Sequence, residues 1–108
     1  MRIPFMLFSL FSVFFLLPPV VRGAESTMSP MEWDSDYKEA DYLNFDLLTS
    51  DPTLCEDACA KDPKCMAWTY IKPNTVQGPR ARCWLKHSIP PKQSNPNTVT
   101  GYKILKKG

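Results

Sequence analysis

Four cysteines and a single histidine are the residues of this chain whose types and spacing could support chemistry. They are Cys55, Cys59, Cys65, Cys83 and His87. Zinc accepts three thiolates and an imidazole, so Cys55-x3-Cys59 with Cys83-x3-His87 is one interpretation. However, the first spacing is wider than the usual CxxC knuckle, and an even number of cysteines in an exported chain is typical of a disulfide framework. We therefore expect two disulfides, no bound metal and no cofactor.

The pairing of the cysteines depends on a helix predicted over residues 52–61. Cys55 and Cys59 are one turn apart on it, so a bond between them would constrain little beyond the helix itself. Two pairings remain, either Cys59 with Cys65 and Cys55 with Cys83, or Cys55 with Cys65 and Cys59 with Cys83. Cys59 is nearer the helix end, so the short segment to Cys65 favours the first pairing.

Catalytic signatures are weak in this sequence. Ser88 adjoins His87, but a triad requires groups that converge in space, and adjacency along the chain does not provide this. The carboxylates between Glu32 and Asp46 are dispersed among aromatic residues, without a paired acid and base. We expect a protein that is not an enzyme.

Charge is distributed unevenly along the chain. Residues 24–62 contain 11 acidic and two basic residues, whereas residues 63–108 contain nine basic residues and no acid. We expect the two halves mainly to neutralise each other within one fold. The alternative is a basic face offered to an anionic partner, because arginine and lysine suit carboxylate, sulfate and phosphate groups. The candidate ligand-binding residues are Lys72, Arg80, Arg82 and Lys86.

Aromatic side chains are the other candidates for ligand contact. Tyr37, Tyr42, Trp68, Tyr70 and Trp84 could each offer a stacking face to a sugar. A domain this small needs large side chains in its interior, so we expect Trp68, Tyr70 and Trp84 to form an aromatic core.

The first 23 residues have the features of a secretory signal peptide. A basic Arg2 precedes an uncharged apolar run of 15 residues, and small residues surround a plausible cleavage site after Gly23. An uncleaved anchor is the alternative, although the run is shorter than the roughly 20 residues of a spanning helix. We expect export to a periplasm or the extracellular space, without stable membrane insertion after cleavage.

The rest of the chain suits one small domain. We expect a signal peptide over 1–23, a flexible leader over 24–40, the domain over 41–105 and a tail over 106–108. Within the domain the sequence predicts strands over 42–45, 65–71, 82–86 and 99–105, the last at a sheet edge. It also predicts loops over 72–80 and 89–97. The small side chains of Cys65, Ala67 and Thr69 are expected to face the helix.

The runs from Cys55 to Tyr70 and from Cys83 to Lys86 resemble the PAN/apple family, which has two helix cysteines, a cysteine opening a strand, and a Cys-Trp-Leu-Lys strand. The resemblance covers residues 41–102 and is closest to the short four-cysteine, stand-alone type of bacteria. It implies an α+β fold, a twisted antiparallel sheet with one helix packed across it. It also implies the disulfides Cys55–Cys83 and Cys59–Cys65.

Members of that family bind proteins or carbohydrates, and no catalytic residue belongs to the motif. The resemblance therefore implies a non-catalytic recognition module for an extracellular or periplasmic protein or polysaccharide, and no nucleic-acid partner is expected. A structural component of an envelope or matrix, without a dedicated ligand, remains the alternative.

Overall fold

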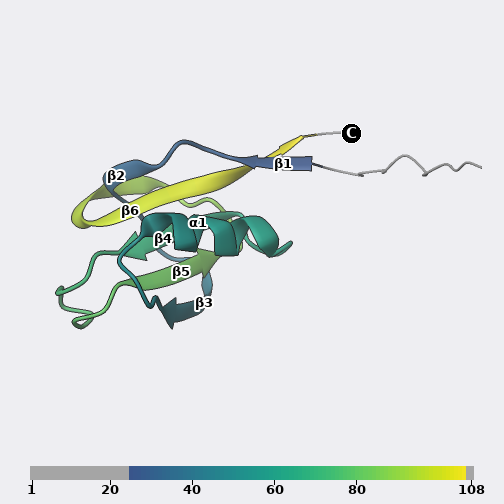
Figure 1. Ribbon diagram of the computed structural model, residues 1–108. Coiled ribbons are helices and arrows are strands. Elements are labelled where there is room, and N and C mark those ends of the chain that lie inside the picture. The colour runs from purple at the N-terminus through teal and green to yellow at the C-terminus, as the bar shows by residue number, and fades with distance from the viewer. Residues whose placement is uncertain (1–24, 107–108) are drawn as a thin grey trace, which may run out of the picture.

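The computed structural model describes residues 25–106, which form one curled antiparallel sheet and one helix (Figure 1). The sheet order is β1-β6-β4-β5-β3, and β2 also pairs with β6. This is the expected α+β class. In chain order the elements are β1 (Glu25–Met28), β2 (Glu32–Tyr37), β3 (Asp41–Asp46), α1 (Pro52–Lys61), β4 (Ala67–Ile71), β5 (Arg82–Lys86) and β6 (Lys92–Lys106).

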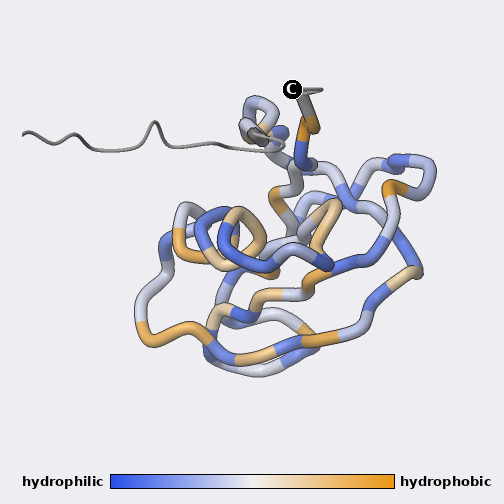
Figure 2. Tube along the Cα trace, turned by 90° about the vertical axis from the view of Figure 1, so that its right-hand side faces the viewer, coloured by the Kyte–Doolittle hydropathy of each residue, from blue (hydrophilic) through white to orange (hydrophobic). Residues whose placement is uncertain are grey.

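Helix α1 has the bounds that its sequence predicts. The Asp51 side chain caps its first turn by accepting from the Thr53 amide at 2.9 Å, and Pro52 occupies the first helical position. At its other end the Asp62 amide donates to the carbonyl of Cys59. Hydrophilic and hydrophobic residues alternate around its turns (Figure 2), and its buried residues are Cys55 and Cys59. A narrow, sulfur-containing stripe therefore faces the sheet.

Both disulfides implied by the family resemblance are present. Cys55 bonds Cys83 on β5, and Cys59 bonds Cys65 just beyond the helix. All four residues are fully buried. By loop entropy the longer loop contributes about 3.5 kcal/mol and the shorter about 2 kcal/mol. Together these are comparable to the net stability of a small domain, so the helix is held to the sheet covalently.

The apolar core lies between α1 and one face of the sheet. Trp68 and Tyr70 of β4 pack there with Leu85 of β5 and Val99 of β6. Gly101 of β6 is needed beside Trp68, because a Cβ there would lie 2.8 Å from the indole ring. The helix packs on the face with the large side chains, contrary to our expectation. Its cysteine stripe is narrow enough to leave room for aromatic rings against the sheet.

The opposite face of the sheet is concave and polar. The first residues of β6, 92–94, precede its pairing with β4 and pair with β2 instead. Thr69, Thr98 and Thr100 are buried on this side. The hydroxyl of Thr98 donates to the carbonyl of Ser35 at 2.6 Å, and the hydroxyls of Thr69 and Thr100 lie 3.2 Å apart. Hydroxyl groups therefore make up part of the buried filling of this side.

Several sequence expectations are corrected by the strand pairing. The range 24–40, expected as a flexible leader, contains β1 and β2. The expected loop over 89–97 is largely β6, and β6 is an interior strand flanked by β4 on one side and by β1 and β2 on the other. Pro96 is tolerated because it lies where the β2–β6 register shifts, so no ladder donor is lost. The expected signal peptide and residues 107–108 lie outside the described residues.

Candidate functional site

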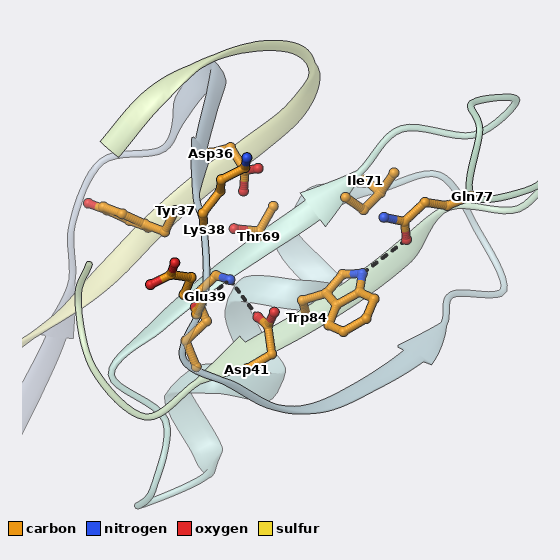
Figure 3. A pocket seen from close by; sticks show the side chains of 10 residues that line it. Asp36, Tyr37, Lys38, Glu39, Asp41, Thr69, Ile71, Gln77 and Trp84 are labelled. Atoms are coloured by element: carbon orange, nitrogen blue, oxygen red, sulfur yellow. Dashed lines mark hydrogen bonds and ion pairs between the residues drawn. The ribbon is translucent and has the colours of Figure 1, made fainter. Parts of the chain in front are cut away.

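A pocket of about 190 Å³ opens on the concave face of the sheet (Figure 3). Its walls come from the end of β2, the turn to β3, the first residue of β3, and the faces of β4 and β5 opposite the helix, with one residue from the β4–β5 loop. Polar and charged side chains dominate the lining. The lining residues are Asp36, Tyr37, Lys38, Glu39, Asp41, Thr69, Ile71, Gln77, Trp84 and Lys86.

Trp84 is the large aromatic side chain of this pocket. It is only half-buried, and its indole nitrogen donates to the side-chain oxygen of Gln77 at 3.1 Å (Figure 3). We expected Trp84 in the core, and this was wrong. The signal was present in the sequence. Alternation along β5 places Cys83 and Leu85 on the helix face, so Trp84 between them must face the other way.

Lys86 lies beneath the pocket with only 2% of its surface exposed. Its ammonium donates to the Asp41 carboxylate at 2.5 Å and to the carbonyl of Glu39 at 3.1 Å. The sequence offers Lys86 as a candidate ligand-binding cation. In the structure its side chain is buried on the concave side of β5, and its charge is balanced by Asp41.

The turn between β2 and β3 forms one rim of the pocket in an unusual conformation. Glu39 and Ala40 both have left-handed backbone geometry, with φ of 77° and 67°. For residues other than glycine this costs of order 1–3 kcal/mol each. The turn is anchored from β5, since the His87 amide donates to the carbonyl of Ala40 at 3.0 Å. The rest of the fold therefore holds this rim in a conformation that its own residues disfavour.

The segment that builds this pocket also matches a known family. The family model described as PAN domain matches residues 35–86, a range that includes every residue of the pocket lining. This region is a PAN domain. Comparison with curated proteins and with solved structures finds no match to the chain. β1 and β6 lie outside the matched range, so the long pairing partner of β4 is an addition to what the family model recognises.

The other basic candidates of the PAN domain do not converge on one site. Lys72 donates to the Asp34 carboxylate at 3.0 Å and to the carbonyl of Pro96 at 2.8 Å, and it lies over the ring of Trp33. Arg80 is exposed and lines a separate hollow near the end of β3. Of the four candidates, only Lys86 lines the pocket.

Ion pairs join the acidic and basic halves of the chain. Arg82 pairs with Asp46 at 2.5 Å, and Lys92 pairs with Glu32. The pairs Lys72–Asp34 and Lys86–Asp41 follow the same rule. These pairs engage Lys72, Arg82 and Lys86, so three of the four basic candidates are balanced by acids of the N-terminal half.

The remaining aromatic candidates are divided between the two sides. Tyr37 is buried at the pocket wall, whereas Tyr70 belongs to the core under the helix. The Tyr42 hydroxyl donates to the Asp62 carboxylate at 2.5 Å, linking β3 to the end of the helix. Burial, followed by this hydrogen bond, raises the pKa of Tyr42, and the same bond lowers the pKa of Asp62. Tyr42 is thus a structural residue.

The zinc interpretation is contradicted by the disulfides, which consume all four cysteines. Within residues 25–106, no group of three potential ligand side chains could hold a metal ion. His87 is exposed at the end of β5 and does not line the pocket. In the same range, no helix has the length and apolarity needed to cross a membrane.

Proposed function

We propose that this PAN domain is an exported, non-catalytic module that recognises a carbohydrate through the pocket on its concave face. The proposal depends chiefly on Trp84, a half-buried tryptophan at the pocket with its ring held by Gln77. PAN domains are in general protein- or carbohydrate-binding modules, and the proposal assigns this chain to the second class.

The composition of the pocket suits the two-sided chemistry of a sugar ring. The apolar C–H face of a sugar can stack on an indole, while its hydroxyl edge needs donors and acceptors. Gln77, Thr69 and Asp41 supply such groups around Trp84. The main ionic group of the pocket floor, Lys86, is already neutralised by Asp41. An uncharged ligand is therefore favoured over a polyanion.

The size of the pocket limits the ligand. Its volume of about 190 Å³ is below the roughly 300–1,000 Å³ of pockets for drug-sized molecules. A terminal sugar or a single residue of a longer glycan fits this space better than a large ligand. Binding would then be weak at one site and would gain strength from repeated contacts on a glycan-rich surface.

Export is the second part of the proposal. It is supported by the charge-free apolar run near the N-terminus and by the two buried disulfides, which persist in oxidising compartments. The intact mass of the native protein, measured without reduction, tests this part. Loss of residues 1–23 and of four cysteine hydrogens supports export, and a full-length chain with free thiols contradicts it.

The deciding experiment uses residues 24–108, produced with both disulfides, on a panel of immobilised neutral and anionic glycans. Trp84→Ala is compared with Trp33→Ala, a matched control that removes an exposed tryptophan outside the pocket. We expect binding to neutral glycans that Trp84→Ala abolishes and Trp33→Ala preserves. Binding that survives Trp84→Ala contradicts the assigned pocket. Absence of glycan binding, with or without capture of a specific surface protein, contradicts the carbohydrate class.

A further inference from the structure

We propose that Lys86 is a positioning residue, which shapes the pocket by holding the β2–β3 turn and does not itself contact the ligand. The statement about ligand binding rests on the proposed function. The statement about the turn does not, and it can be tested on the free protein.

The surroundings of Lys86 argue against direct contact with a ligand. Its side chain is almost completely enclosed, with 2% of its surface exposed. Its two hydrogen-bond acceptors are the Glu39 carbonyl in the β2–β3 turn and the carboxylate of Asp41, the first residue of β3. An ammonium buried in this way has already exchanged its water for protein oxygens, so its effect on a ligand must pass through these two residues.

The β2–β3 turn needs such support because its own sequence does not specify its shape. Glu39 and Ala40 are both left-handed, a geometry that glycine or asparagine normally provides. Two consecutive residues at the end of β5 hold the turn in this geometry by hydrogen bonds. Lys86 donates through its side chain to the carbonyl of Glu39, and His87 donates through its amide to the carbonyl of Ala40.

The position of the turn matters because it carries part of the pocket wall. Lys38, Glu39 and Asp41 all line the pocket, and Trp84 lies two residues before Lys86 on the same face of β5. β5 therefore both presents the Trp84 ring and, through Lys86, holds the rim of the pocket opposite that ring. If the rim were released, Trp84 would remain in place while the polar groups facing it would move.

The test compares three variants of the oxidised residues 24–108 by amide hydrogen exchange and ¹⁵N relaxation. Lys86→Met removes both hydrogen bonds, and Asp41→Asn removes the ion pair but leaves the bond to Glu39. The double variant Lys86→Met/Asp41→Asn contains no unpaired carboxylate, which protects folding if the single Lys86→Met variant fails to fold. Lys72→Met is the matched control, since Lys72 also bonds one carboxylate and one carbonyl, outside the pocket.

We expect the hydrogen-exchange rate of the His87 amide to rise about tenfold in Lys86→Met and in the double variant, as expected for a lost charged hydrogen bond. Residues 38–40 should become more mobile in the same two variants. Asp41→Asn and Lys72→Met should leave the turn ordered. A double variant with an ordered turn would overturn the proposal, because Lys86 would then serve only to neutralise Asp41.

Affinity for a neutral glycan that binds the unmodified domain provides the second measurement. We expect a loss of about tenfold or more in the double variant relative to Asp41→Asn, together with the mobile turn. Loss of affinity with an ordered turn would place Lys86 in direct contact with the ligand, and unchanged affinity with a mobile turn would remove the turn from the site. Both results overturn the positioning role. If no glycan binds any form, the proposed function fails, and the exchange data still decide whether Lys86 holds the turn.

Discussion

The two faces of the sheet are built from different chemistry, although the same strands provide both. Under α1 the side chains are sulfur, aromatic and aliphatic groups, and two disulfides close this side. On the concave side the buried groups include three threonines and Lys86, whose charge is balanced by Asp41. The first face supplies most of the stability. The second retains hydrogen-bonding groups and a pocket, which is the arrangement expected where stability and recognition are separated.

The strongest test of this separation compares two tryptophans on neighbouring strands. Trp68→Ala removes a fully buried ring under the helix and should cost about 3–5 kcal/mol of unfolding free energy. Trp84→Ala removes a half-buried ring on the concave face and should cost about 1 kcal/mol. Chemical denaturation of both oxidised variants measures the difference. Equal losses would mean that the concave face contributes as much stability as the core.

Removal of the longer disulfide should produce the next largest effect. Cys55→Ala with Cys83→Ala should lower the free energy of unfolding by about 3.5 kcal/mol. Cys59→Ala with Cys65→Ala, which opens a shorter loop, should lower it by about 2 kcal/mol. Thermal unfolding of the two double variants side by side provides the measurement. The reverse order would show that packing around the cysteines, and not loop closure, determines their contribution.

A smaller effect of opposite sign is expected at the rim of the pocket. Ala40→Gly relieves the left-handed strain at φ of 67° and should stabilise the domain by about 0.5–1 kcal/mol, after the added freedom of the unfolded chain is deducted. Denaturant titration would detect this gain. A loss of stability would indicate that the Ala40 methyl makes a favourable contact that outweighs the strain.

The smallest effect concerns acid pH on the helix side. Hydrogen bonds from Tyr42 and from the Lys64 amide lower the pKa of Asp62. Ionised Asp62 therefore stabilises the fold above its unfolded pKa of about 3.9, and this contribution is lost as the pH falls through its lower folded value. Tyr42→Phe should reduce the decrease in stability between about pH 6 and about pH 2. An unchanged pH profile in that variant would assign the acid sensitivity to other carboxylates.

Sequence reasoning was most successful for the helix side, because strong local signals coincide there. The capping aspartate, the proline after it and the cysteine spacing predicted α1 with the observed bounds, and the family resemblance implied the disulfide pairing. β3 and β5 were also predicted, within one residue at each end. These elements are specified by residues close to one another in the chain.

The concave side was predicted less well, because long-range pairing and not local pattern creates it. β2 has the sequence Glu-Trp-Asp-Ser-Asp-Tyr, mostly polar and largely exposed, so it lacks the alternation of a half-buried strand. It exists as a strand because β6 pairs with it. The roles of Trp84 and Lys86 could have been derived from alternation along β5, whereas the anchoring of the β2–β3 turn required the three-dimensional register.

The alternation along β5 also has a consequence for how the protein matures. A shift of the strand by one residue would turn Cys83 away from the helix and Trp84 into the core. Cys55 could then no longer be oxidised by pairing with Cys83, since disulfide geometry tolerates little displacement. Formation of that bond during oxidative folding therefore requires the register in which Cys83 faces the helix. A chain that holds the Cys55–Cys83 disulfide is therefore one in which Trp84 faces the pocket.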